Sequence, residues 1–168
     1  GMNVARQLGL RLGLPVASPA CTVNMACASG LKAVALAAQA IAQGEAGLVL
    51  AGGVESMSRA PHYAMDLRSG RRLGGGEVVA TGEHPRAGMT PEKLAQLKPA
   101  FRKDGTVTAG NASGINDGAA LVLVAGAASC SEHGLKARAR IVASCAVGCD
   151  PCMMGLGPVG AVRRVLDE

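Results

Sequence analysis

Apolar residues recur at three- and four-residue steps between residues 27 and 43, which is the period of a helix with one buried face. The repeating positions are Leu31, Val34, Ala35, Ala38 and Ile41. The stretch contains no proline, and its Ala, Leu, Gln and Lys residues favour helix. Gly44 follows where a helix-capping glycine is expected. The pattern therefore predicts a helix over residues 27–43.

Two stretches that flank this helix predict strands. Residues 20–23 contain β-formers and follow the breakers Pro15 and Pro19, and residues 48–51 are a short apolar run. Strand, helix and strand in this order predict a parallel pair with a right-handed crossover. Ligands gather at the carboxyl ends of such strands, where both Cys27 and a turn at Gly52 and Gly53 would fall. These glycines either let the backbone approach a reacting centre closely or form an ordinary tight turn.

The rest of the pattern predicts two helices, two strands and a connecting loop. They are a helix over residues 1–12, a helix from Pro91 to Pro99, a strand over 119–124, a loop over 125–134 and a strand over 139–146. The strand over 119–124 is apolar throughout, which predicts that it is buried. Thr90 suits the N-cap of the second helix, and Pro91 suits its first residue.

Composition limits the kind of core and partner. A chain of 168 residues is long enough for one domain with a sizeable core. Because there is one Phe, one Tyr and no Trp, Ala, Val, Leu and Met must build that core. The net charge of +5 comes from scattered Lys and Arg with almost no stacking aromatics, which argues against a nucleic-acid partner. No apolar run is long enough to predict a membrane partner.

The six cysteines follow no disulfide-scaffold pattern, and we expect a reduced, cytoplasmic setting. Cys149 and Cys152 have the CxxC spacing of some metal sites. A zinc site would need two further ligands, and neither a second such pair nor a His cluster accompanies them. No metal is therefore predicted.

Cys27 lies between a predicted strand and the start of the predicted helix. Free amide N–H groups and the positive end of the helix dipole stabilise a thiolate at such a position. Cys27 can therefore be nucleophilic near neutral pH. A small apolar cysteine can also simply pack at the start of an Ala-rich helix, and position alone leaves both interpretations open.

Four stretches match motifs of one family, in the family's order. They are residues 23–33 (VNMACASGLKA), 51–61 (AGGVESMSRAP), 106–120 (TVTAGNASGINDGAA) and 154–159 (MGLGPV). The chain thereby resembles thiolases, the acetyl-CoA acetyltransferases and 3-ketoacyl-CoA thiolases. The resemblance implies a layered α/β thiolase-like fold, with most of the N-terminal domain and the first strand and helix of the C-terminal domain. It places that first helix at residues 157–166.

The resemblance also implies a domain organisation. Residues 1–65 correspond to the N-terminal core with the nucleophile helix, and residues 66–105 to a shortened remnant of the loop domain. Residues 106–136 complete the N-terminal domain with a CoA-contacting loop, and residues 137–168 begin the C-terminal domain. In the family a segment like the first residues of this chain follows earlier strands and a helix, so we expect the chain to be truncated at its start.

For the site, the resemblance implies that Cys27 is the nucleophile of an acyltransferase. It implies that Ala109 and Ser113 touch the pantetheine arm of CoA and that Phe101 packs nearby. The family's reaction joins two acetyl-CoA molecules into acetoacetyl-CoA or cleaves a 3-ketoacyl-CoA with CoA, and it needs no cofactor besides these CoA thioesters. Intact members form homo-oligomers.

The family's catalytic histidine and its second cysteine have no counterpart among these residues. We therefore expect this polypeptide alone not to complete the thiolase cycle. Two other functions stay open: an inactive remnant or partner subunit of a thiolase, and a ketoacyl-synthase-like enzyme acting on acyl-carrier protein. Asn24 and the Asn-Ala-Ser-Gly stretch at residues 111–114 argue against the synthase.

Overall fold

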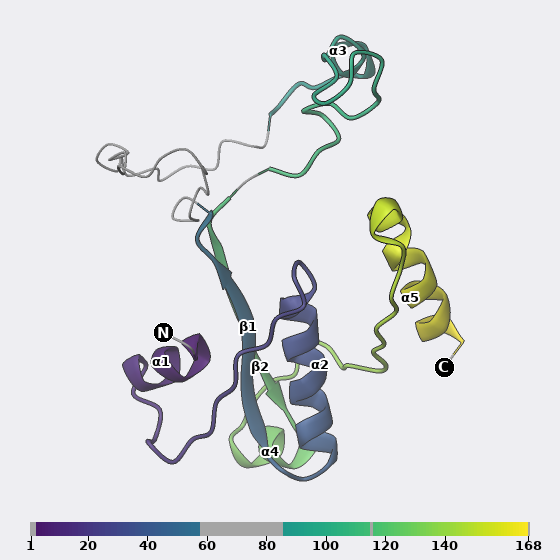
Figure 1. Cartoon of the computed structure of the whole chain (residues 1–168). Coiled ribbons are helices and arrows are strands. Elements are labelled where there is room, and N and C mark those ends of the chain that lie inside the picture. The colour runs from purple at the N-terminus through teal and green to yellow at the C-terminus, as the bar shows by residue number, and fades with distance from the viewer. Residues whose placement is uncertain (1–2, 58–85, 115, 168) are drawn as a thin grey trace. The chain divides into compact units, whose positions relative to one another are not determined.

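The computed structural model describes residues 3–57, 86–114 and 116–167. Contacts divide the chain into two units, which are described separately below (Figure 1). The first unit combines Gly1–Val54 with Ala119–Glu168, and the second is Glu55–Gly118. Within the described ranges no helix is both long enough and apolar enough to cross a membrane.

The first unit begins with helix α1, Val4–Arg11, which confirms the predicted N-terminal helix. Asn3 is its N-cap and accepts a hydrogen bond from the Arg6 N–H at 3.0 Å. Gly13 ends the helical region because its φ of +78° suits a residue without Cβ. Local signals, a cap at each end and an apolar repeat between them, therefore favour α1.

The strand predicted over residues 20–23 is wrong. Hydrogen bonds tie this stretch and the residues before it to α1 and its N-cap: Asn3 Nδ2 donates to the Ala20 carbonyl at 2.8 Å, and the Arg6 guanidinium donates to the Ser18 carbonyl at 2.7 Å. The Ala5 N–H in turn donates to the Thr22 hydroxyl at 3.3 Å. The stretch lies against α1 and its N-cap and does not join the described sheet, so the expected parallel pair with its crossover does not form in this part of the chain.

Helix α2, Ser29–Ala42, confirms the helix predicted over residues 27–43. It ends as expected, because Gly44 adopts a φ of +77° and its N–H donates to the Ile41 carbonyl at 3.1 Å. Cys27 lies two residues before its first turn.

Strands β1, Leu48–Glu55, and β2, Gly118–Ala125, form a two-stranded sheet (Figure 1). The strands are antiparallel, because the Gly126 N–H donates to the Gly47 carbonyl at one end while Gly52 lies beside Ala120 and Leu121 further along. The predicted turn at Gly52 and Gly53 is therefore wrong, since β1 continues through both glycines. Gly52 fits the strand because it has no Cβ to meet the neighbouring backbone.

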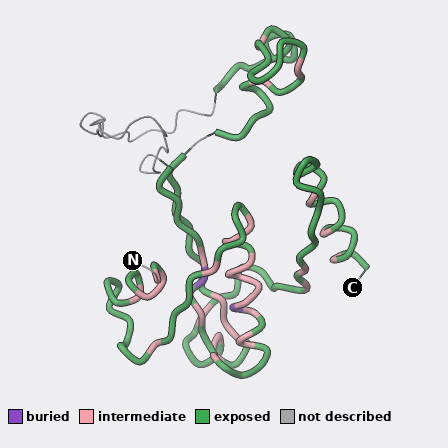
Figure 2. The backbone as a smooth tube through the Cα atoms, in the orientation of Figure 1, coloured by how far each residue is buried: buried purple, intermediate pink, exposed green. Residues whose placement is uncertain are grey.

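Burial is sparse in the described residues (Figure 2). Ala37 of α2 and Ala51 of β1 are the buried residues among them, so the sizeable core expected from chain length is not present. The prediction that residues 119–124 are buried is also wrong. In the described ranges the sheet has two strands, and large side chains such as Leu121 and Leu123 are about half exposed.

Helix α4, Ala127–Glu132, stands where a loop over residues 125–134 was predicted. The strand predicted over 139–146 is also wrong in the described structure. Here the Cys145 thiol donates to the Ala161 carbonyl at 3.2 Å, so the segment lies against the following helix and not in a ladder. That helix, α5, Gly157–Leu166, is preceded by the 3₁₀-helix η2, Pro151–Leu156, and confirms the helix expected at residues 157–166.

The second unit contains helix α3, Pro91–Ala95. Thr90 is its N-cap, as predicted, but the helix ends four residues before Pro99. After it, the Ala100 N–H donates to the Val107 carbonyl at 2.8 Å and closes a short hairpin-like loop.

The Thr90 hydroxyl lowers the pKa of the Glu92 carboxyl below its usual value by hydrogen bonding, and the backbone N–H of Glu92 adds to the effect. Because the folded pKa is lowered, this contribution to α3 is present above the unfolded pKa and is lost as the pH falls through the folded one. We expect Thr90→Ala to raise the pKa of Glu92 toward its usual value in an NMR titration of the side-chain carboxyl. Thr106→Ala, outside α3, should leave the titration unchanged, and identical curves for both variants would contradict the assignment.

Candidate active site

Cys27 is exposed and lies in a tight loop that leads into α2. The Ala28 N–H donates to the Met25 carbonyl at 3.0 Å, and the Ser29 N–H donates to the Ala26 carbonyl at 3.1 Å. These two bonds reverse the chain direction around Cys27. The thiol is thereby presented to solvent immediately before the N-terminus of a helix, as the sequence predicts.

The backbone of this loop is strained at Ala26. Its φ is +47°, and among the described residues no other non-glycine residue has a positive φ. Such a conformation costs a residue with a Cβ roughly 1–2 kcal/mol. Side-chain hydrogen bonds of about 0.5–1.5 kcal/mol each can offset that cost, and the loop contains several of them.

Two side chains supply these bonds. The Asn24 Oδ1 accepts a hydrogen bond from the Ala26 N–H at 3.0 Å. The Ser29 hydroxyl accepts one from the Met25 N–H at 2.8 Å and donates one to the Ala26 carbonyl at 2.7 Å. Side chains of neighbouring residues therefore bond both the N–H and the carbonyl of Ala26.

The Cys27 N–H differs from the neighbouring amides in its hydrogen bonding. The amides of Ala26 and Ala28 both have acceptors inside the loop, whereas the Cys27 amide has none in the described part of the chain. A free N–H beside the nucleophile can donate to the oxyanion that develops when a thioester carbonyl is attacked. The loop thus offers a thiol and a donor on the same residue.

A hollow of about 160 Å³ lies between the start of α2 and the sheet. It is lined by Gly30, Leu31, Val34, Ala51, Gly52, Gly53, Ala120 and Val122. All of these residues are apolar or glycine, so the hollow suits an apolar group. Gly30, three residues after Cys27, lies at its edge.

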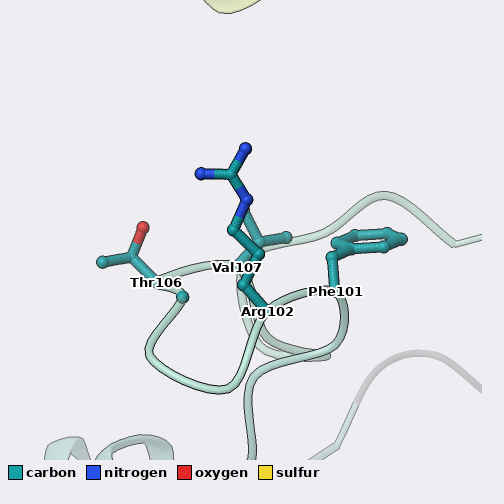
Figure 3. Close-up of a pocket in the computed structure, with 5 residues that line it drawn as sticks. Phe101, Arg102, Thr106 and Val107 are labelled. Carbon is teal, nitrogen blue, oxygen red and sulfur yellow. The ribbon is translucent and has the colours of Figure 1, made fainter.

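Phe101 lies in the second unit, on the loop after α3, and is 82% exposed. With Arg102, Gly105, Thr106 and Val107 it lines a hollow of about 230 Å³ (Figure 3). The Gly105 N–H donates to the Arg102 carbonyl at 3.0 Å and closes the turn beneath these side chains.

Ala109 and Ser113, the other predicted CoA contacts, are both exposed and belong to the same unit as Phe101. Asn111 shapes the turn that carries Ala109: its Oδ1 accepts from the Thr108 N–H at 2.7 Å, and its Nδ2 donates to the Thr106 carbonyl at 2.9 Å. Cys27 belongs to the first unit.

Sequence reasoning missed the residues that shape both loops, Asn24, Ser29 and Asn111. Asn and Ser side chains commonly bond to backbone groups a few residues away, which is the one sequence signal that points to them.

The CxxC pair lies at the start of η2. Cys149 and Cys152 are both exposed, and Asp150 Oδ1 accepts a hydrogen bond from the Cys152 N–H at 2.8 Å. Within the described residues no group of three or more His, Cys, Asp or Glu side chains is arranged to hold a metal ion.

Comparison with known proteins shows the family to which this chain belongs. A family model described as the N-terminal domain of thiolase matches residues 1–79 and 72–128. The chain belongs to the thiolase family. Curated thiolases agree: it is 38% identical to the acetyl-CoA acetyltransferase of Pseudomonas aeruginosa, over all of this chain and 62% of that protein. It is 36% identical to a beta-ketoadipyl-CoA thiolase of Acinetobacter baylyi, over 99% of this chain and 61% of that protein.

Solved thiolase structures confirm the expected fold. The structure of acetyl-CoA acetyltransferase from Syntrophomonas wolfei matches with a TM-score of 0.84 and 31% identity, over 99% of this chain and 60% of that one. Human mitochondrial 3-ketoacyl-CoA thiolase in complex with CoA matches with a TM-score of 0.83 and 32% identity, over 98% of this chain and 59% of that one. The chain thus spans about 60% of the length of these thiolases.

Proposed function

We propose that this thiolase chain takes an acyl group from an acyl-CoA onto Cys27. The Cys27 thiolate attacks the thioester carbonyl, the carbonyl–sulfur bond to CoA breaks, and CoA leaves as a thiolate that takes a proton from water. The observation that carries this proposal is the loop itself, which presents an exposed thiol beside a free N–H at the start of α2. The N–H donor stabilises the tetrahedral oxyanion.

The acyl-CoA class rests on the relatives, whose names include acetyl-CoA acetyltransferase and beta-ketoadipyl-CoA thiolase. In the full thiolase reaction the acyl group would then pass to acetyl-CoA to form acetoacetyl-CoA, or to CoA after cleavage of a 3-ketoacyl-CoA. CoA thioesters are substrates in this scheme, and no cofactor is required. Assembly into a homo-oligomer and a cytoplasmic location stay predictions.

Phe101, Ala109 and Ser113 are proposed to contact the pantetheine arm of CoA. Ala109 is small and exposed on its turn, which leaves room for a narrow ligand. The Ser113 hydroxyl is exposed and able to bond an amide of the arm. The Phe101 ring offers apolar surface at the edge of its hollow.

Mass spectrometry after incubation with acetyl-CoA tests the proposal. We expect one acetyl group per chain, located on Cys27 by peptide mapping. Cys21, Cys149 and Cys152 are exposed thiols outside the loop and serve as internal controls, because accessibility alone would label them equally. The absence of an adduct, or acetyl groups spread over all exposed cysteines, would contradict the proposal.

A further inference from the structure

The Ser29 hydroxyl makes hydrogen bonds that are unusual for a serine at the start of a helix. A serine there ordinarily acts as N-cap and accepts from an amide in the first turn of its own helix. Here the N-cap position is Ala28, which makes no side-chain cap bond, and Ser29 is the first helical residue. Its hydroxyl bonds backwards, to the Met25 N–H and to the Ala26 carbonyl. The hydroxyl therefore shapes the loop and does not cap the helix.

These bonds hold Ala26, which among the described residues is the one non-glycine residue with a positive φ. Ser29 holds the carbonyl on one side of Ala26, and Asn24 holds its N–H on the other. The left-handed backbone at Ala26 sets the direction in which the next residue leaves the loop. That next residue is Cys27.

We infer that Ser29 is a positioning residue for Cys27: with Asn24 it holds Ala26 in the left-handed conformation and so fixes the Cys27 thiol and N–H at the start of α2. The inference rests on the proposed function, in which Cys27 is the nucleophile. If the loop relaxes, the Cys27 thiol and N–H no longer keep their fixed positions at the start of α2, and the reactivity of the thiol falls.

Thiol reactivity measured with two reagents tests this role. Iodoacetamide reports on the Cys27 thiolate without requiring a CoA site, and acetyl-CoA reports on acyl transfer. For Ser29→Ala we expect the rate of Cys27 modification by each reagent, followed by peptide mapping, to fall by about tenfold, because both hydrogen bonds of the Ser29 hydroxyl to the loop are lost. Ser29→Thr keeps the hydroxyl and should restore most of the rate.

A second variant separates positioning from a general loss of structure. Glycine adopts a positive φ without steric cost, so Ala26→Gly in the Ser29→Ala background should recover part of the lost reactivity. Ser131→Ala is the matched control, because Ser131 also donates from its hydroxyl to a backbone carbonyl, that of Ala127, but lies in α4 outside the loop. It should leave Cys27 unchanged, and circular dichroism should show equal helix content in all variants.

The role of Ser29 would be overturned if Ser29→Ala reacts with iodoacetamide as fast as the unmodified chain. It would also be overturned if neither Ser29→Thr nor the Ala26→Gly combination restores the rate. Should the unmodified chain fail to react with acetyl-CoA, the proposed function fails, while the iodoacetamide rates still decide whether Ser29 positions Cys27.

Discussion

Replacing Cys27 with serine is expected to lower acetyl transfer from acetyl-CoA to the chain by at least about a thousandfold. A serine hydroxyl is not ionised near neutral pH, and the helix terminus that stabilises a thiolate does not make the hydroxyl a comparable nucleophile. The measurement is the amount of acetyl group bound per chain over time, with labelled acetyl-CoA in excess.

Cys21→Ser is the matched control for this substitution. Cys21 is an exposed free thiol, as Cys27 is, but it lies outside the loop that leads into α2. We expect its loss to leave acetyl transfer unchanged. If Cys27→Ser kept the labelling rate of the unmodified chain, the acyl acceptor would have to be another group.

A second large effect is expected at Gly52, where substitution by alanine should disrupt the pairing of β1 and β2. A Cβ at this position would overlap the Ala120 carbonyl and lie 2.9 Å from Leu121 Cα, so the backbone of the neighbouring strand would have to move. Overpacking of this kind costs roughly 1–3 kcal/mol or more. Urea unfolding followed by circular dichroism measures the loss in free energy of unfolding.

Gly53→Ala, one residue further along the same strand, is the control. A Cβ at Gly53 would meet the Gly30 Cα at 3.8 Å, which is an ordinary contact. Because glycine and alanine differ equally in backbone freedom at both sites, the difference between the two variants isolates the steric effect. Equal unfolding free energies for both variants would show that Gly52 is not needed for strand pairing.

The helices could be predicted from the sequence because their determinants are local. The apolar repeat and the glycine at residue 44 define α2, and Thr90 with Pro91 defines the start of α3. The strands could not be predicted in the same way, since an apolar run shows β propensity but not the partner. Residues 20–23 contain β-formers, yet the Ala20 carbonyl accepts from Asn3 Nδ2 and the Thr22 hydroxyl accepts from the Ala5 N–H, so the stretch lies against α1 and its N-cap.

The candidate site was predictable in part. The motif around Cys27 locates the thiol at the start of a helix, and the structure places it there. The supporting contacts of Asn24 and Ser29 depend on the backbone conformation of Ala26. An alanine with a positive φ is uncommon, so no pattern of residue types would have indicated it.

The antiparallel pairing of β1 with β2 bears on how far the chain between them can vary in length. β1 ends at Glu55 and β2 begins at Gly118, so 62 residues connect the two strands. The alignment with the Pseudomonas aeruginosa relative extends over 242 positions against 168 residues, a difference of 74. The two matched stretches of the family model meet at residues 72–79, inside this connection.

The entropy of closing a flexible loop grows only with the logarithm of its length. For a flexible loop, growth from 62 residues by all 74 positions would raise the closure cost by only about 0.7 kcal/mol. Insertions and deletions of this size in a flexible loop therefore change the free energy of strand pairing only slightly. The sheet can thus keep the same pairing in chains whose intervening segments differ by dozens of residues.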